Sequence, residues 1–387
     1  MFKKRQYYIV GVDMVIIINI FKIHLKIIYF FLKFLKTDNH KIVFMSRQYN
    51  DVSIDYQLLY DDIKKRYNKY KVVMLNKKLE KNNIISYYFH IYKQMYYLAT
   101  SKVCLVDTYI IPVSILNHKK DITIIQLCHG IGNIKKFGYQ SLHKESGKNE
   151  KISLLMDMHK NYDYLISTSD ETSKFYSEAF NMDKSKMLNF GPPKIDYLLK
   201  ISSKKDLILK KYPKLKNKKN VLYVVTFRTY RFDFLTEFIE KFPYEKFNLI
   251  LNVHPVMYKH YPDIEYKIND KRIFRCKEFI TTDLLSICDI AITDYSSFAF
   301  ESAILNIPTF FYLPDYKKYQ EYNGLNVNLF KEMPGCVFEK YDDLFEAINK
   351  DKYDYTMLKK FKNKYIKNCD GTSTQKLSDF MIKKCKK

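Results

Sequence analysis

Two histidines follow apolar runs typical of buried β-strands, and their side chains could act on a hydroxyl and on a phosphate. His129 lies in QLCHGIGNIKKFG (126–138), and His254 lies in LNVHPV (251–256). An imidazole with an unperturbed pKa near ~6.5 can remove a proton from a hydroxyl, and its protonated form can offset charge on a departing phosphate. Both histidines are therefore candidate catalytic residues. The alternative is a histidine that only closes an ordinary strand-exit loop.

Basic residues in two loops suit an anionic ligand. Lys135 and Lys136 follow His129, and the glycines of that loop let backbone amides approach a phosphate. Arg228 ends VVTFR (224–228), where its guanidinium could clamp a diphosphate. An arginine on a solvated loop is the alternative.

The segment ITDYSSFAFESAIL (292–305) predicts a strand, a turn and a helix in succession. Ser296 and Ser297 stand at the predicted helix N-terminus, where amides and hydroxyls can bind an anion. Glu301 lies about one turn further on and could reach a ribose hydroxyl. Helix capping alone would also explain the two serines.

Metal and thiol chemistry are not predicted. The sequence contains no D-x-D triplet, so we expect neither a metal-held diphosphate nor a cofactor. Its seven cysteines are scattered singly, without a C-x-x-C pair, which favours a reducing cytosol over a disulfide framework or a zinc site. Cys128 and His129 would point to opposite faces of an extended strand, so we interpret Cys128 as a packing residue.

Short β-rich runs that alternate with helical stretches must position these residues. In the first half the predicted strands are 41–45, 71–75, 103–107, 122–127, 162–167 and 186–191; in the second half they are 221–227, 247–253, 272–276, 289–294 and 307–313. This rhythm predicts an α/β fold with two doubly wound, Rossmann-like domains that face each other across a cleft. A Lys-rich stretch at 200–220 separates the domains. We expect an N-terminal segment at 1–37, an acceptor-side domain at 38–200 and a donor-binding domain with C-terminal helices at 220–387.

Composition and charge restrict the partners. The 387 residues are 47% hydrophobic, which excludes a largely disordered chain, and their net charge of +24 favours anionic partners. In the apolar stretch 14–36 the polar residues would share one stripe of a helix: Asn19, Lys22, Lys26, Lys33 and Lys36. The lysines interrupt a membrane span and favour an in-plane helix on an anionic membrane surface. The alternative is a first strand and helix whose apolar face packs in the core.

In order along the chain, the motifs resemble those of the CDP-glycerol glycerophosphotransferase family, the teichoic-acid and capsule polymerases. The family's Q-x-W-H-G, with its following Lys and Gly, resembles QLCHGIGNIKKFG. Its G-x-P-R-N-D, P-T-F-R, L-H-P and T-D-Y-S-S motifs resemble GPPKID (191–196), VTFR (225–228), VHP (253–255) and TDYSS (293–297). A closing D-G resembles Asp370-Gly371, so the similarity extends from about residue 41 to 380.

The resemblance implies a GT-B enzyme that transfers glycerol phosphate or ribitol phosphate from a CDP-linked donor to a hydroxyl of a lipid-linked or polymeric acceptor. CMP would be released, in teichoic acid or capsule synthesis. His129 would be the base and His254 would assist CMP departure. The implied donor-binding residues are Thr226, Arg228, Asp294, Ser296, Ser297 and Glu301. The implied acceptor or phosphate side is Lys135, Lys136 and Asp196. No cofactor and no nucleic acid is expected, and the enzyme would be peripheral on the cytoplasmic face of the membrane.

Some residues depart from the family pattern. Cys128 replaces the usual Trp, Lys194 and Ile195 replace Arg and Asn, and one residue is added after Gly130. These changes affect the acceptor side more than the donor side. Two rivals remain: a GT-B glycosyltransferase that uses a nucleotide sugar, and a basic nucleic-acid-binding or membrane-binding protein without activity.

Overall fold

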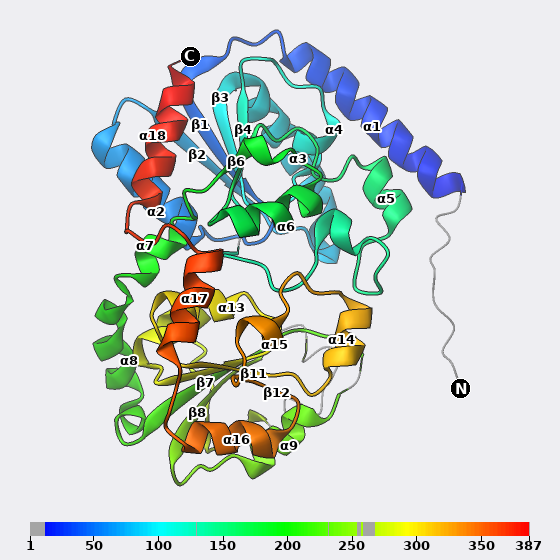
Figure 1. The fold of residues 1–387 in the computed structure, drawn as a ribbon. Helices are drawn as coiled ribbons and strands as arrows, with labels where there is room; N and C mark the ends of the chain where they lie inside the picture. Colours follow the sequence, from blue (N-terminus) through cyan, green and yellow to red (C-terminus); the bar gives the residue numbers. More distant parts are fainter. Residues whose placement is uncertain (1–11, 129, 231, 254–256, 258–267, 387) are drawn as a thin grey trace.

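Two six-stranded parallel sheets form the two lobes of the molecule (Figure 1). The computed structural model describes residues 12–128, 130–230, 232–253, 257 and 268–386. The first sheet has the order β2-β1-β3-β4-β5-β6 and contains β1 Asp38–Ser46, β2 Lys71–Asn76, β3 Ser101–Val106, β4 Thr123–Gln126, β5 Tyr164–Ile166 and β6 Met187–Leu188. The second has the order β12-β11-β10-β7-β8-β9 and contains β7 Lys219–Val225, β8 Phe247–Val253, β9 Ile273–Phe274, β10 Ile290–Thr293, β11 Thr309–Tyr312 and β12 Val337–Phe338. The predicted α/β class with two doubly wound domains is confirmed.

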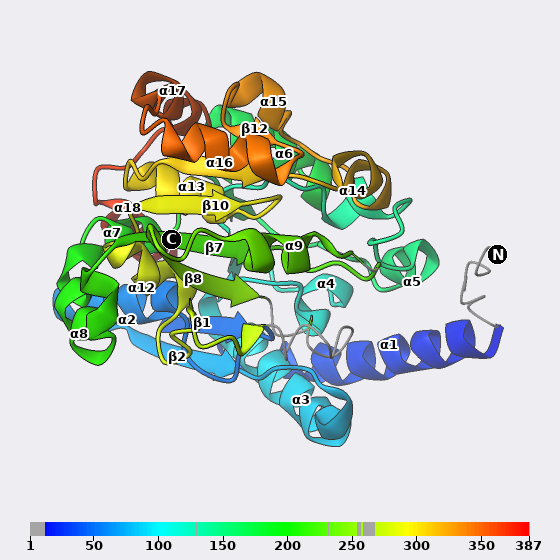
Figure 2. The same ribbon diagram turned by 90° about the horizontal axis from the view of Figure 1, so that it is seen from below.

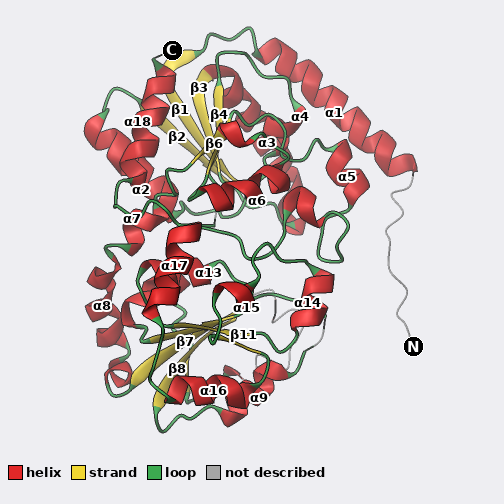
Figure 3. Cartoon of the chain, in the orientation of Figure 1, coloured by secondary structure: helices red, strands yellow, loops and turns green. Residues whose placement is uncertain are grey.

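Helices cover both faces of each sheet (Figure 3). Those of the first half of the chain are α1 Val12–Leu32, α2 Ile54–Arg66, α3 Ile84–Thr100, α4 Ile111–Ile115, α5 Glu150–Leu155, α6 Asp170–Phe180, α7 Lys194–Leu198 and α8 Lys205–Lys211. Those of the second half are α9 Phe234–Lys241, α12 Thr281–Leu284, α13 Phe298–Ile304, α14 Tyr316–Tyr322, α15 Leu329–Glu332, α16 Tyr341–Asn349, α17 Tyr355–Tyr365 and α18 Ser373–Cys385.

Strand β1 shows why the sheet is buried on both sides. Ile42 and Phe44 pack into a core cluster with α2 and α18, whereas Val43 and Met45 pack into another with α3 and α4. A strand that is apolar at every position buries both of its faces, as parallel sheets require. The short edge strand β12 was not predicted from the sequence.

The C-terminal helix α18 returns to the first domain. It lies beside α2 and the first sheet in Figure 1, and its buried residues Leu377, Met381 and Ile382 belong to the core of that sheet. Asp196 accepts hydrogen bonds from the backbone amides of Ser373 (3.1 Å) and Thr374 (2.7 Å) at the start of this helix. The last residues of the chain therefore belong structurally with the first domain, whereas the sequence assigned them to the second.

Helix α1 docks on the first domain along one narrow face. Leu25 and Tyr29 are buried, and the ammonium of Lys22 donates to a carboxylate oxygen of Asp157 at 2.7 Å. Most other apolar side chains of the helix are exposed; Ile17, for example, is 64% exposed. One apolar face of the helix therefore packs on the core, as the alternative expected, while most of its apolar side chains stay exposed. The helix ends before Lys33.

Among the described helices, Asp13–Leu32 alone is long and apolar enough to cross a membrane by length and composition. Core helices and signal sequences share that property, and only 11% of its most apolar window is buried in the protein. Seen from below, α1 lies beside α3 on the outside of the first domain (Figure 2).

Candidate functional site

A cavity of about 500 Å³ lies between the two domains at the carboxyl ends of both sheets. The first domain lines it with the loop that leads from β1 into α2, and with Asp107, which directly follows β3. The second domain lines it with Ser296, Ser297 and Glu301, which follow β10. Open α/β sheets bind ligands at this edge, so three of the predicted donor residues occupy the expected place.

Lys194 joins the domains at the edge of this cavity. Its ammonium donates to Glu301 Oε1 at 2.6 Å, and its backbone amide donates to Asp55 Oδ1 at 2.7 Å. Burial alone would lower the pKa of Lys194, but the Glu301 carboxylate outweighs it and raises that pKa. The other Glu301 oxygen accepts from the Thr282 hydroxyl at 2.9 Å, so both oxygens already have a protein partner.

The two serines differ in their local bonding. Ser296 Oγ accepts from the backbone amide of Phe298 at 3.2 Å, as a capping residue does. Ser297 is the N-cap residue of α13, but its side chain makes no capping bond. Because α13 has only seven residues, its dipole adds little, and an anion here would depend on the hydroxyls and on Lys194.

The loop after β4 lies against these serines. A side chain on Gly130 would bring its Cβ within 3.9 Å of Ser297 Cβ, and one on Gly132 would overlap the Phe300 ring at 2.7 Å. Glycine at 132 therefore permits the close contact between this loop and α13. Cys128 and Gly130 are described, but His129 lies outside the described residues, as does His254. Their catalytic roles stay predictions.

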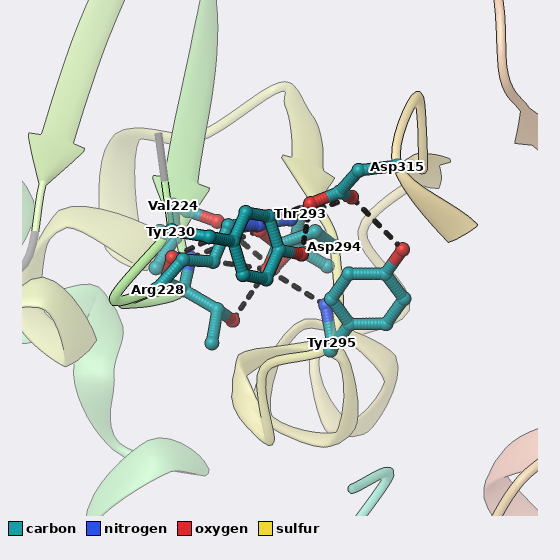
Figure 4. A network of polar contacts seen from close by, with 8 residues as sticks. Val224, Arg228, Tyr230, Thr293, Asp294, Tyr295 and Asp315 are labelled. Atoms are coloured by element: carbon teal, nitrogen blue, oxygen red, sulfur yellow. Dashed lines mark hydrogen bonds and ion pairs between the residues drawn. The ribbon is translucent and has the colours of Figure 1, made fainter. Parts of the chain in front are cut away.

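Arg228 is the centre of a buried polar network in the second domain (Figure 4). Its guanidinium donates to Asp294 Oδ2 at 2.8 Å, to the Thr226 carbonyl at 2.7 Å and to both oxygens of Asp315 at 2.5 and 3.1 Å. Asp294 in turn accepts from the backbone amide and the hydroxyl of Thr226. Tyr230 and Tyr295 donate their hydroxyls to Asp315.

In this network the guanidinium N–H groups of Arg228 donate to acceptors of the protein itself. The Arg228 side chain is 0% exposed, so in this arrangement it does not face a ligand. Burial alone would raise the pKa of Asp315, but its bonds from Arg228, Tyr230 and Tyr295 outweigh burial and lower it. Thr226, Arg228 and Asp294 thus lie beneath the turn that carries Ser296 and Ser297, where they can hold that turn in place.

The predicted acceptor-side residues are not all in one place. Lys135 and Lys136 line a second cavity of about 320 Å³ in the first domain, and the backbone of Lys136 is bonded to Gly324 of the second domain. Asp196 lines neither of these two cavities; its carboxylate is bonded to the amides at the start of α18, where it borders a third cavity of about 330 Å³. Among the described residues, no group of three or more His, Cys, Asp and Glu side chains could hold a metal ion.

Sequence reasoning missed several residues of the two cavities. Arg47 and Asp107 directly follow β1 and β3. Because ligands bind at the carboxyl ends of strands in such sheets, their positions could have identified them, as positions after strands identified the two histidines. Lys194 belongs to GPPKID, where it differs from the arginine of the family motif, and the motif gives no sign of its bond to Glu301. Asp315 closely follows β11 at the start of α14, so its strand-end position could also have indicated it. Lys148 lies in a loop without any comparable pattern, and only the folded structure reveals it.

Known proteins with similar sequences are teichoic acid enzymes. The chain is 29% identical over 362 residues to the teichoic acid ribitol-phosphate primase of Bacillus spizizenii, which covers 90% of this chain and 92% of the primase. It is 31% identical over 307 residues to the teichoic acid glycerol-phosphate primase of Bacillus subtilis, which covers 78% of this chain and 77% of that one.

Solved structures share the fold. The wall teichoic acid polymerase TagF matches with a TM-score of 0.71 and 18% identity, over 97% of this chain and 98% of the compared chain. A TagF variant soaked with CDPG gives the same TM-score of 0.71. The likeness shows two Rossmann-like domains in the GT-B arrangement, as the motifs predicted. A family model for CDP-glycerol:poly(glycerophosphate) glycerophosphotransferases matches residues 27–383, so this chain belongs to that family.

Proposed function

We propose that this protein transfers glycerol phosphate or ribitol phosphate from a CDP-linked donor to a hydroxyl of a teichoic acid acceptor, with release of CMP. The family match over residues 27–383 is the observation that carries this proposal. The primases and the polymerase that resemble the chain are named for glycerol phosphate and ribitol phosphate, which supports both polyols equally.

The interdomain cavity fits the donor half of this reaction. We assign the donor phosphates to Ser296, Ser297 and Lys194, which border the cavity with hydroxyl and ammonium donors. Glu301 borders it as well and can accept from a ribose hydroxyl. Thr226, Arg228 and Asp294 then act as positioning residues beneath the serine turn. Transfer of a phosphoryl group depends mainly on such positioning and on charge stabilisation.

Two histidines would carry the proton transfers. His129 would take the proton from the acceptor hydroxyl, and His254 would assist the departure of CMP. The described neighbours of His129 support this assignment, because Gly130 lies against Ser297 at the cavity. We expect His129→Ala to abolish turnover while CDP binds with nearly unchanged affinity. Turnover close to that of the parent would exclude His129 as the base.

CMP release by the purified protein tests the proposed reaction. CDP-glycerol, CDP-ribitol and several nucleotide sugars are supplied in turn, each with and without a lipid-linked polyol-phosphate acceptor. We expect acceptor-dependent CMP from one polyol donor. Turnover of a nucleotide sugar with neither polyol donor active would support the glycosyltransferase rival instead.

We also propose that the protein binds the cytoplasmic face of the membrane through α1 and α3. The exposed apolar residues of the two helices lie on adjacent elements: Ile16, Ile17, Ile20, Ile23, Ile27, Phe30 and Phe31 on α1, and Ile84, Ile85 and Phe89 on α3. Lys26 is exposed on α1, and Lys36 is exposed just after it, where both can meet anionic headgroups. An apolar face bordered by lysines favours a lipid surface over a second protein chain.

Liposome flotation tests this surface. We expect Ile17→Asp combined with Phe31→Asp to abolish flotation with phosphatidylglycerol vesicles, because two carboxylates oppose both burial in lipid and anionic headgroups. A matched double substitution at exposed Leu199 and Leu207, on the far domain boundary, should leave flotation unchanged. Flotation of the α1 variant equal to that of the parent would contradict the assignment.

A further inference from the structure

We infer that the 320 Å³ cavity of the first domain binds the phosphate of the acceptor's terminal polyol-phosphate unit, through Arg47, Lys148, Lys135 and Lys136. This inference rests on the proposed function, since it names the substrate group that the first domain holds. The sequence motifs include neither Arg47 nor Lys148. Arg47 directly follows β1, and Lys148 lies in the loop before α5.

The cavity lies at the carboxyl ends of the central strands. Arg47 follows β1, Asp107 and Thr108 follow β3, and Gln126 ends β4. The segment from Lys135 to Lys148 forms the opposite wall, and Asn323 closes the cavity from the second domain. This position is where a doubly wound sheet binds its ligand.

The cations of this cavity differ from other cations of the protein in their ion pairing. Neither Arg47, Lys135, Lys136 nor Lys148 forms an ion pair with another residue in the described part of the chain. Other cations in protected positions do: Lys22 pairs with Asp157, Lys194 with Glu301, and Arg228 with Asp294 and Asp315. Arg47, Lys135 and Lys136 are partly buried, and a partly buried cation without a counter-charge costs free energy that a bound anion would recover. Lys148 is exposed at the rim of the cavity, where an anion can reach it.

Two of the cations are held close to each other by one aromatic ring. The Arg47 guanidinium lies 4.9 Å from the centroid of the Tyr109 ring, and the Lys148 ammonium lies 5.8 Å from it. The surrounding protein and then the Arg47 charge lower the pKa of Lys148 to about 8. The same surroundings, with Lys148 and Arg47, lower the pKa of His159 to about 3, so this neighbouring ring is neutral. The positive charges of Arg47 and Lys148 therefore lie close together beside the Tyr109 ring.

One wall residue connects this cavity to the donor cavity. Asp107 lines both of them, and Ser296 and Ser297 line the interdomain cavity with it. A ligand whose phosphate meets Arg47 and Lys148 can therefore extend its hydroxyl past Asp107 toward the donor. A polyol phosphate carries both groups on one short chain. The proximity would bring the nucleophile to the donor without further binding elements.

Calorimetry with glycerol 3-phosphate tests the site without any need for turnover. The full chain and the variants Arg47→Gln and Lys148→Ala are titrated with glycerol 3-phosphate, inorganic phosphate and CDP. Lys151→Ala is the matched control, because it removes an exposed lysine three residues from Lys148 that does not line the cavity. We expect glycerol 3-phosphate to bind at least about tenfold more weakly to both variants, with CDP binding unchanged.

The remaining outcomes separate the possible sources of the phosphate. Equal affinity of parent and variants for glycerol 3-phosphate, or no binding to the parent, would overturn the inference. Loss of binding to phosphatidylglycerol vesicles, with glycerol 3-phosphate unaffected, would assign the cations to the membrane surface and overturn it as well. Calorimetry does not depend on CMP release. A protein that binds glycerol 3-phosphate as expected, but releases no CMP in the separate donor assay, would refute the proposed reaction and leave the phosphate site supported.

Discussion

The two domains differ in how their functional cations are paired. In the second domain Arg228 is fully buried, and its donors are bonded to Asp294, Asp315 and the Thr226 carbonyl. In the first domain Arg47 and Lys148 line a cavity and have no ion-pair partner in the described part of the chain. Arg228 is fully buried among protein acceptors and therefore supports structure, whereas cations that line a cavity without an ion pair are available to a ligand.

The carboxylates show the same contrast. Bonds from Arg228 and two tyrosines lower the pKa of Asp315, although burial opposes them. Burial raises the pKa of Asp107 and of Asp55 to about 6, at the edge of the cleft. Hydrogen bonds therefore stabilise the charge of Asp315 in the second domain, whereas burial disfavours the charges of Asp55 and Asp107 at the cleft edge of the first domain.

Among the substitutions that test this contrast, replacement of Arg228 should have the largest effect on stability. Arg228→Met leaves Asp294 and Asp315 buried without their cation, so we expect the free energy of unfolding to fall by about 3–5 kcal/mol. Urea denaturation measures the change. Arg272→Met removes an exposed arginine that pairs with Asp270 and lies over the Tyr244 ring, and it should cost no more than about 1 kcal/mol. An Arg228 variant as stable as the parent would show that the network is not structural.

Asp107→Asn should instead raise the free energy of unfolding at neutral pH. Because the folded-state pKa of about 6 exceeds the ordinary 3.8, the folded protein binds the extra proton between these values and loses stability as the pH rises through them. The neutral amide avoids this loss. We expect a gain of about 1–3 kcal/mol at about pH 7 that disappears at about pH 4. Unfolding at both pH values measures it, with exposed Glu245→Gln as the control. A variant destabilised at neutral pH would contradict the sign.

Asp196→Ala tests a saturated carboxylate of the first domain. Loss of its two bonds to the amides of α18 should cost about 1 kcal/mol and speed hydrogen exchange in that helix. Asp354→Ala removes an equivalent cap from α17 and should leave exchange in α18 unchanged. If hydrogen exchange in α18 stays as slow in Asp196→Ala as in the parent, Asp196 does not hold this helix, and the predicted acceptor-side role of Asp196 gains support.

Lys148→Ala should have the smallest effect on stability. The lysine has no ion-pair partner among the described residues and lies beside Arg47, so we expect the free energy of unfolding to change by no more than about 0.5 kcal/mol. A loss comparable to that of Arg228→Met would mean that Lys148 is a structural residue, which would remove the distinction between the two charge clusters. Thermal denaturation of the variant and the parent is sufficient.

Local pattern predicted much of the fold but only part of the site. The rhythm of strands and helices identified eleven strands, because buried parallel strands are continuous apolar runs. It did not place α18 on the first sheet, since contacts between Asp196 and Ser373 join residues far apart in the sequence. Strand-end positions drew attention to Ser296 and Ser297, which line the cleft. The same positions did not reveal that Arg228 is neutralised by Asp315, because no local pattern links a strand end to a distant loop.

Steady-state kinetics of CMP release, with donor and acceptor varied separately, tests the division between the two domains most directly. With CDP-glycerol or CDP-ribitol and a soluble polyol-phosphate acceptor, Ser296→Ala combined with Ser297→Ala should raise the donor KM and leave the acceptor KM unchanged. Arg47→Gln and Lys148→Ala should raise the acceptor KM and leave the donor KM unchanged. If both sets of variants raise the same KM, the two cavities do not divide the substrates as proposed, and the account of this enzyme is wrong.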